Sequence, residues 1–455
     1  MALNSVRAIL LDPKDDVAAV LDSVAKGDIV TITDAVSGKP LMHLDVRQEI
    51  PFGHKVALRE IASDKPVFRY GWPIGIATAD IRMGEHVHSH NMRSALSPAA
   101  KQAARESLVR SAQWVRNLVN SCVQAAGGSP ESASAMAEAI TEAHLRGVET
   151  HGLRRLSPYI ARIRSGGVQA NARPQISAAK ALLHVDGRNG IGHHVASVAA
   201  RAVSEAAREF SIAIALVKNS NHFGFAGYYA TLIAAEGQLG IISSNGQVCV
   251  GPEGARQPVL SNNPLAIAAA LPERDAFLEL DLATSATSRA NVVEARKFRT
   301  LLPAGWAQDC SGTPTRDPAA ALAGTLLAFG GEKGFGLLVA LEALTGVLCG
   351  GAFADEVSSK EAAPGAPEGT AHTLIAIDLE TALGRDGYAE RLDQLIRKLK
   401  ELPMHPDAPD VRYPGERRWR LRRERLRNGV PLSQSDIEEA RRLAKELGVP
   451  SHELD

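Results

Sequence analysis

The sequence predicts a mixed α/β protein preceded by a small all-β domain. About the first 95 residues form short runs of alternating apolar and polar side chains that turn residues interrupt, which is the pattern of half-buried strands. Farther along, apolar residues recur at helical spacing, and helical stretches then alternate with short strands. The 455 residues suffice for two or three domains. We therefore expect one domain over residues 1–97 and a larger one over residues 98–455.

The composition is typical of a soluble globular protein, with 45% hydrophobic and 22% charged residues. Lys+Arg and Asp+Glu both total 51, so no net charge attracts nucleic acid or a membrane. The four cysteines form no CxxC pair, which argues against a disulfide framework or zinc ribbon and favours a reducing compartment. No signal peptide and no apolar run of about 18 residues is present. We expect a cytoplasmic protein without nucleic-acid or membrane partners.

The N-terminal domain is predicted to consist mainly of β-strands. Residues 27–46, "GDIVTITDAVSGKPLMHLDV", alternate around a turn and predict a hairpin. In "HVHSH", His86, His88 and His90 are two residues apart, so an extended strand would carry them on one face. Converging imidazoles bind a divalent metal or hold a carboxylate, and His54 is a candidate fourth contributor. A polar strand edge explains the triplet equally well, so these readings stay open.

Helical spacing marks the start of the second domain. A helix is predicted over residues 98–126, from a Ser-Pro pair to a Gly-Gly pair, with Leu108 beside its apolar face, and a second helix over residues 130–145. The following segments predict helices at 195–210 and 228–237 and strands at 212–218, 239–244 and 277–281.

The last hundred residues carry three local signals. Residues 362–369, "AAPGAPEG", have the composition of a surface loop. The basic run 417–427 predicts a solvated face rather than a nucleic-acid patch, because it is short and the chain is neutral. A closing helix is predicted from a capping box of Ser435 and Glu438 to Gly448.

The stretch "NSNHFGFAGYYA", residues 219–230, places one ionisable ring among small, aromatic and uncharged side chains. His222 is either a core histidine or a catalytic acid/base, and the motif alone leaves both readings open. In "THGLRR", His151 and Arg155 would share one face of a helix, where a guanidinium can hold a substrate carboxylate. Three further histidines have no such pattern and are predicted to be structural: His144, His193 and His194.

Eight segments of residues 100–455 resemble, in order, the malate/L-lactate dehydrogenase family of NAD(P)-dependent oxidoreductases. Among them are "RGVETHGLRRLSPYIARIRSGG", "SNHFGFAGYYA", "LELDLATSATS" and "GGEKGFGLLVALEALTGVLCGG". The resemblance implies a non-Rossmann fold, which agrees with the lack of a complete GxGxxG motif. It also implies interconversion of a 2-hydroxy acid and its 2-oxo acid with NAD or NADP, and subunits that pair as a homodimer.

The same resemblance assigns residues to roles. It makes His222 the catalytic acid/base and places His151 and Arg155 in the substrate pocket. The positions that match cofactor contacts are Gly246, Asp281, Leu282, Ala283, Lys333, Gly415 and Glu416. This sequence lacks the glycine that commonly follows the "ATS" segment, so the choice between NAD and NADP stays open.

The N-terminal segment "RYGWPIGIATADIRMGEHVHSHNMRSALS" resembles the β-clip (SAF) domain of the altronate/galactarate dehydratase family. In that family a larger domain with the dehydratase core follows, and here the dehydrogenase follows instead. The resemblance therefore implies a lyase or dehydratase module that needs a separate large subunit, with a non-catalytic binding or assembly module as the alternative. The segments "YGWPIGIATADI" and "EHVHSHN" are more similar to the sugar-acid dehydratases than to the sulfo-lyases. The resemblance therefore favours a substrate derived from a sugar acid, with sulfolactate and a sulfo-lyase-type module as the alternative.

Overall fold

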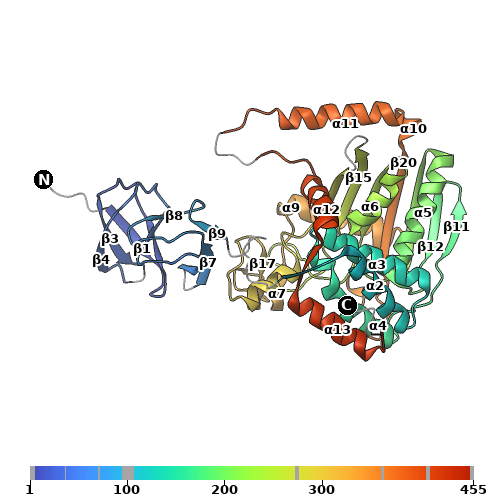
Figure 1. The fold of residues 1–455 in the computed structure, drawn as a ribbon, viewed down its shortest axis with the longest axis horizontal. Helices are drawn as coiled ribbons and strands as arrows, with labels where there is room; N and C mark the ends of the chain where they lie inside the picture. Colours follow the sequence, from blue (N-terminus) through green and yellow to red (C-terminus); the bar gives the residue numbers. More distant parts are fainter. Residues whose placement is uncertain are drawn as a thin grey trace. The chain divides into compact units, whose positions relative to one another are not determined.

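The computed structural model describes residues 6–35, 37–69, 72–94, 107–271, 276–359, 363–405 and 410–450. The chain forms two compact units, which Figure 1 colours along the sequence. Unit 1 comprises residues 1–106 with 290–304 and 315–322, and unit 2 comprises residues 107–289, 305–314 and 323–455. The predicted boundary at residue 97 lies outside the described residues.

Unit 1 is built on two β-sheets, which confirms the all-β prediction for the N-terminal domain. Their orders are β4-β3-β1-β2-β5-β8 and β6-β7-β9. The strands are β1 (Val6–Leu10), β2 (Val17–Val20), β3 (Ile29–Asp34), β4 (Pro40–Asp45), β5 (Lys55–Ala57), β6 (Pro66–Arg69), β7 (Trp72–Ala77), β8 (His86–Val87) and β9 (Met92–Ser94). Antiparallel pairing of β3 with β4 confirms the predicted hairpin, whose alternating side chains Val30, Ile32 and Leu44 are buried in the core.

A seven-stranded mixed sheet forms the centre of unit 2, with the order β11-β12-β13-β20-β14-β15-β16. Its strands are β11 (Gln175–Ala179), β12 (Leu182–Asp186), β13 (Ile212–Ser220), β14 (Gln238–Ser244), β15 (Leu265–Leu271), β16 (Ala276–Leu282) and β20 (Thr370–Asp378). β12 and β13 are parallel, whereas β20 is antiparallel to both of its neighbours. The three strands predicted in this region correspond to β13, β14 and β16, and the sheet confirms the mixed α/β class.

Helices cover both faces of this sheet. α5 (Gly192–Phe210) packs on β13 and β20, and α6 (Ala226–Ala235) packs on β14 and β15 (Figure 1). Fully buried alanines such as Ala199, Ala215 and Ala268 permit close approach of these helices to the strands. Leu216, the neighbour of Ala215 on β13, packs instead against Cys349. Because successive strand residues face opposite sides, the π-helical turn η3 (Ala343–Val347) covers the other face.

A helical layer surrounds a second core in unit 2. It contains α2 (Ala112–Ala125), α3 (Pro130–Leu145), α4 (Leu156–Arg164) and α13 (Gln434–Glu446), together with a ribbon of β10 (Ser107–Arg110) and β21 (Val430–Ser433). α3 confirms the helix predicted over residues 130–145.

The remaining elements of the chain are α7 (Arg289–Lys297), β17 (Ala307–Gln308), β18 (Pro314–Thr315), α8 (Pro318–Ala323), β19 (Thr325–Leu326), α9 (Glu332–Glu342), η4 (Ala354–Glu356), α10 (Leu379–Ala382), α11 (Arg385–Lys400) and α12 (Glu416–Asn428).

Two predicted helix starts are wrong. The helix predicted to begin at residue 98 begins at Ala112, where the Ser111 hydroxyl accepts the Trp114 N–H. Residues 107–110 pair with β21, more than 300 residues away, so Leu108 lies on a strand and local spacing cannot detect it. The closing helix is capped by Ser433 rather than Ser435.

None of the helices in the described part of the chain has the length and hydropathy needed to span a bilayer.

Candidate active site

A cavity of about 230 Å³ in unit 2 brings predicted site residues together. It lies between α4, the start of α5, the turn after β13 and the loop before β20. His222 and Arg155 both line it, and the His151 ring is stacked parallel to the His222 ring with centroids 5.7 Å apart. The full lining is Met136, Arg155, Pro158, Tyr159, Ala161, Arg162, Ile163, Val168, Ile191, Gly192, His193, Asn221, His222, Pro364 and Glu368.

His222 lies two residues after the end of β13, in a turn that other side chains hold in place. The preceding Asn221 donates to the Asn189 Oδ1 and to the Gly190 carbonyl, and Gly224 has a φ of +86°, which favours glycine. The His222 Nδ1 lies 2.7 Å from the Tyr159 hydroxyl. The ring is therefore presented to a cavity with one nitrogen engaged, and the core-histidine reading does not describe its position.

Tyr159 is the partner of His222 that the sequence did not reveal. It lies on α4, four residues after Arg155, and its half-buried side chain lines the cavity. Burial, with a smaller contribution from the Glu368 carboxylate, raises the pKa of Tyr159 well above its ordinary value. The hydroxyl consequently remains protonated at neutral pH, and its oxygen can accept a hydrogen bond from the His222 Nδ1–H, the tautomer that carries its lone pair on Nε2.

Arg155 and His151 do not share a regular helix as predicted. They lie in two short 3-10 helices, η1 (Glu149–His151) and η2 (Leu153–Arg155), which Gly152 separates. A side chain at Gly152 would clash with His144, since its Cβ would lie 2.3 Å from the His144 Nε2. The Arg155 Nε donates to the Thr150 carbonyl at 3.0 Å, which orients the guanidinium at the cavity wall.

The histidines predicted to be structural differ among themselves. His144 is buried, and its Nε2 accepts the Leu153 N–H at 2.8 Å, which confirms a structural role. His193, also buried, forms part of the cavity wall and packs edge-on against Tyr159 with ring centroids 4.9 Å apart. Burial lowers the pKa of His193 to about 3, so its ring is neutral at physiological pH. His194 is partly buried, and burial lowers its pKa as well.

The loop before β20 is exposed at Pro364, Gly365 and Pro367, which confirms the surface-loop prediction for the described residues 363–369, but part of the loop also lines the cavity. Pro364 and Glu368 line the cavity, and Glu368 is only 2% exposed. The Glu368 Oε2 accepts the His222 backbone N–H at 3.1 Å. The loop composition alone did not indicate this role, because the contact joins residues 146 positions apart.

Several residues predicted to bind the cofactor gather beyond the end of β16. Ala283 follows the strand, and the next residue, Thr284, donates its N–H to Asn262 and accepts the N–H of Phe329. These bonds place Ala283 beside the loop that leads to Lys333, an exposed residue in the first turn of α9. The two glycines before α9 both have a φ of +64°, and the N–H groups of a helix start suit an anion such as pyrophosphate.

Gly246 and β16 complete this region. Gly246 lies against Ser261, since a Cβ at Gly246 would be 3.0 Å from the Ser261 Oγ. Asp281 and Leu282 end β16, but the Asp281 carboxylate is already paired with Arg418 at 3.0 Å. An extended nicotinamide dinucleotide therefore fits the glycines, the helix start and Lys333 better than it fits the Asp281 side chain.

Gly415 and Glu416 mark the start of α12, which carries the basic run. Gly415 has a φ of +92°, and a Cβ there would lie 2.9 Å from the Glu279 backbone nitrogen. The Glu416 carboxylate is held by Lys400 at 2.6 Å. Both residues are thus next to β16, and both have structural contacts that involve no ligand.

The basic run is a solvated face only in part: Arg417, Arg420 and Arg427 are exposed, but the opposite side of α12 forms buried ion pairs. Arg418 pairs with Glu279 at 2.9 Å, and Arg422 pairs with Glu142 at 2.9 Å. Both carboxylates are buried, and Arg146 also contacts each of them. Trp419, between the two arginines, is 3% exposed. The sequence did not reveal the paired side of the helix because the acidic partners lie far away in sequence, on α3 and β16.

In unit 1 the predicted histidines converge. The rings of His54 and His88 are stacked with centroids 4.6 Å apart, and the rings of His86 and His90 lie 5.2 Å apart. Burial, followed by the neighbouring His54, lowers the pKa of His86 to about 4. The His54 Nδ1 and His86 Nε2 lie 2.9 Å apart, so one of these nitrogens donates its N–H to the lone pair of the other.

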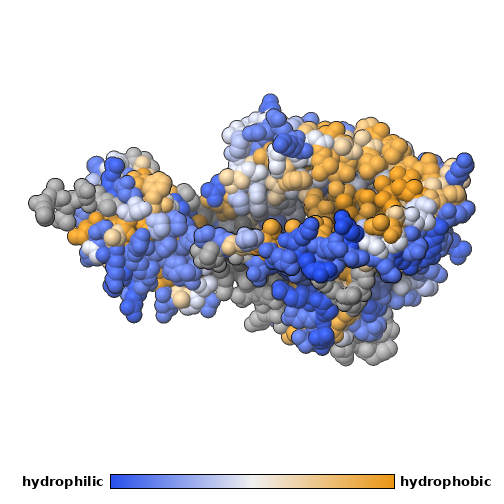
Figure 2. Space-filling view, turned by 90° about the horizontal axis from the view of Figure 1, so that it is seen from above, coloured by the Kyte–Doolittle hydropathy of each residue, from blue (hydrophilic) through white to orange (hydrophobic). Residues whose placement is uncertain are grey.

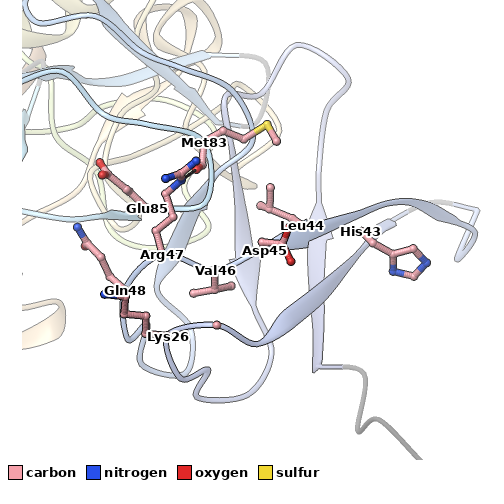
Figure 3. Close-up of a pocket in the computed structure, with 10 residues that line it drawn as sticks. Lys26, His43, Leu44, Asp45, Val46, Arg47, Gln48, Met83 and Glu85 are labelled. Atoms are coloured by element: carbon pink, nitrogen blue, oxygen red, sulfur yellow. Dashed lines mark hydrogen bonds between the residues drawn. The ribbon is translucent and has the colours of Figure 1, made fainter.

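Among the residues that the structure describes, no group of three or more His, Cys, Asp or Glu side chains is arranged to hold a metal ion. The divalent metal predicted at His86, His88 and His90 therefore has no support in the geometry. A separate hollow of about 520 Å³ in unit 1, shown in Figure 3, is lined by residues such as Lys26 and Arg47 and by none of these histidines.

The fold and the cavity are those of a dehydrogenase that does not use a Rossmann domain. The family model described as malate/L-lactate dehydrogenase matches residues 111–440, and the chain belongs to this family. The model described as the altronate/galactarate dehydratase SAF domain matches residues 6–95.

Individual relatives agree with the family. A malate dehydrogenase from Pyrococcus horikoshii is 32% identical over 71% of this chain and 91% of its own length. A Δ1-pyrroline-2-carboxylate reductase from Ancylobacter novellus is 34% identical over 70% of this chain and 92% of its own length. The structure of a sulfolactate dehydrogenase from Methanocaldococcus jannaschii superposes with a TM-score of 0.70 at 28% identity, covering 76% of this chain and 99% of that one.

Proposed function

We propose that unit 2 interconverts a 2-hydroxy acid and its 2-oxo acid with NAD or NADP, using His222 as the acid/base. The observation that carries this proposal is the Tyr159–His222 pair in a cavity that Arg155 also lines. When bound, the reduced nicotinamide supplies the hydride. Oxidation of a secondary alcohol requires a base for the hydroxyl proton, and reduction of the ketone requires the same group as an acid.

Proton transfer, carboxylate binding and positioning of the ring fall to different side chains of the cavity. The Tyr159 oxygen accepts the His222 Nδ1–H whether the ring is neutral or protonated, so Nε2 receives the proton of the substrate oxygen in oxidation and gives it back in reduction. Arg155 holds the substrate carboxylate through its guanidinium, whose orientation the Thr150 carbonyl fixes. His151, stacked on His222, keeps the acid/base ring in place and closes the site on that side.

The test is an absorbance assay of the full chain with a panel of 2-oxo acids and either NADH or NADPH. We expect oxidation of at least one reduced cofactor that depends on both the acid and the enzyme. Absence of turnover across the panel in both directions would contradict the proposal.

We propose a second role for unit 1, as a lyase or dehydratase module that works with a separate large subunit. The converging histidines support this role, because four imidazoles without a carboxylate partner can hold an acidic substrate. The alternative is a non-catalytic binding or assembly module. Elimination of water from sugar acids, and of sulfite from sulfolactate, should require both this chain and the large subunit. Elimination by the chain alone, or no complex with any large subunit, would contradict the proposal.

We also propose that the chain forms a homodimer. Large apolar side chains are exposed along α9, η3 and the residues that follow, namely Leu337, Val339, Val347, Leu348 and Phe353. Figure 2 shows hydrophobic side chains gathered over part of the surface of unit 2. Apolar exposure of this kind is typical of an interface between subunits. Light scattering should give twice the mass of the chain, and Val347→Lys should lower it. A fully active monomer would contradict this proposal.

A further inference from the structure

We infer that the substrate of unit 2 has an uncharged, mainly apolar side chain, and that Glu368 excludes acids with a second anionic group. The inference rests on the proposed function, because His222 and Arg155 orient the substrate. With the C2 oxygen at His222, the carboxylate at Arg155 and one face of C2 turned to the nicotinamide, the substrate side chain occupies the rest of the cavity.

The rest of the cavity is mainly apolar. Its wall consists of Met136, Pro158, Ile163, Val168, Ile191 and Pro364. A hydroxyl or carboxylate placed against such a wall loses its water without gaining a hydrogen bond, which is unfavourable. A volume of about 230 Å³ accommodates a small acid with a short hydrocarbon side chain.

Among the polar groups of this wall, Asn221 and the Arg162 Nη2 are already engaged, whereas the Arg162 Nε and Nη1 and both His193 nitrogens are buried with no hydrogen-bond partner among the described residues. Asn221 uses its Nδ2 on Asn189 and Gly190, and its Oδ1 accepts from the Arg162 Nη2. The same Arg162 nitrogen also donates to the carbonyls of Gly167 and Ala366. The other guanidinium nitrogens of Arg162 are covered by protein atoms and present no surface to the cavity. Arg162 is therefore a poor receptor for a second carboxylate.

Glu368 adds a negative charge to the cavity. It is 2% exposed, and one of its oxygens accepts the His222 N–H. No Lys, Arg or His side chain forms an ion pair with it among the described residues of the chain. Because like charges repel strongly where water is excluded, a second carboxylate or a sulfonate next to Glu368 is disfavoured. Arg155 cannot compensate, since it already holds the first carboxylate.

Two acids of the same shape test this inference. 4-Methyl-2-oxopentanoate has two methyl groups where oxaloacetate has two carboxylate oxygens. We expect kcat/KM of the full chain to favour 4-methyl-2-oxopentanoate by at least about tenfold. Glu368→Gln keeps an acceptor for the His222 N–H but removes the charge, so it should narrow this ratio by at least about fivefold. Glu236→Gln, which alters an exposed glutamate paired with Arg208, is the matched control and should leave the ratio unchanged.

A binding measurement makes the result independent of turnover. Calorimetric titration of 4-methyl-2-hydroxypentanoate and of malate into the full chain with NADH or NADPH, a pairing that cannot react, should show tighter binding of 4-methyl-2-hydroxypentanoate than of malate. A preference for oxaloacetate and malate, or a ratio that Glu368→Gln leaves unchanged, would overturn the inference and leave the proposed function intact. If no 2-oxo acid reacts and no 2-hydroxy acid binds, the proposed function fails, and the inference fails with it.

Discussion

At the scale of single residues, the chemistry of unit 2 depends on side chains that meet from distant parts of the chain. His222 and Tyr159 are 63 residues apart, and Glu368 is 146 residues beyond His222. The motif around His222 was recognisable in the sequence because it is contiguous. Tyr159 and Glu368 were not, because their roles depend on the packing of α4 and of the loop before β20 around the turn.

His222→Ala should lower turnover by about 10²–10⁴-fold, because general acid/base catalysis contributes that much. Binding of NADH or NADPH, measured by fluorescence titration, should change little, since the residues that suit the cofactor lie around the end of β16. A variant that retains nearly all of its turnover would remove His222 from the mechanism.

Arg155→Met should raise KM for 2-oxo acids by about 10- to 100-fold, because a hydrogen-bonded charge on the substrate carboxylate is lost. The KM for the cofactor should change much less. Arg154→Met is the matched control, since Arg154 contacts Asp436 at 3.9 Å and does not line the cavity. Equal weakening of acid and cofactor by Arg155→Met would show that Arg155 acts outside the substrate pocket.

At the scale of elements, helix α12 joins the helical layer of unit 2 to its sheet. Its arginines neutralise Glu142 on α3 and Glu279 on β16, two buried carboxylates that Arg146 alone would leave incompletely paired. The helix was visible in the sequence only as a basic run. Helices α3 and α5 were predictable because their apolar spacing is local, whereas the role of α12 depends on charges more than 130 residues away.

Arg418→Met should lower the free energy of unfolding by about 3 kcal/mol, because it leaves buried carboxylates incompletely compensated. Urea denaturation followed by circular dichroism measures this change. Arg420→Met, on an exposed position of the same helix, should change it by less than about 0.5 kcal/mol. Equal midpoints for the two variants would refute the role assigned to α12.

At the scale of the whole molecule, unit 2 is expected to be sensitive to mild acid. Burial lowers the pKa of each of His144, His193 and His372 to about 3, so these rings are neutral in the folded state. The unfolded chain takes up protons below about pH 6.5, and the folded chain takes them up only near pH 3. Stability is therefore complete above pH 6.5 and falls as the pH decreases between these values.

Each of the three histidines contributes a slope of at most about 1.4 kcal/mol per pH unit, so together they give about 4 kcal/mol per unit. Urea midpoints between pH 6.5 and 5 isolate this effect, because ordinary carboxylates titrate lower. A midpoint that stays constant over that interval would contradict the prediction.

The pairing of β10 with β21 has a consequence for the newly made chain. β10 is the first element of unit 2, and its partner strand, together with the arginines of α12, is encoded within the last forty residues. At about 5–20 residues per second, a ribosome needs on the order of tens of seconds to travel from one strand to the other. During that interval Glu142 and Glu279 lack their α12 partners, and one edge of the ribbon is unpaired. Unit 2 therefore reaches its final packing only after residue 433 has been made, and a premature stop anywhere before residue 430 leaves its first strand without a partner.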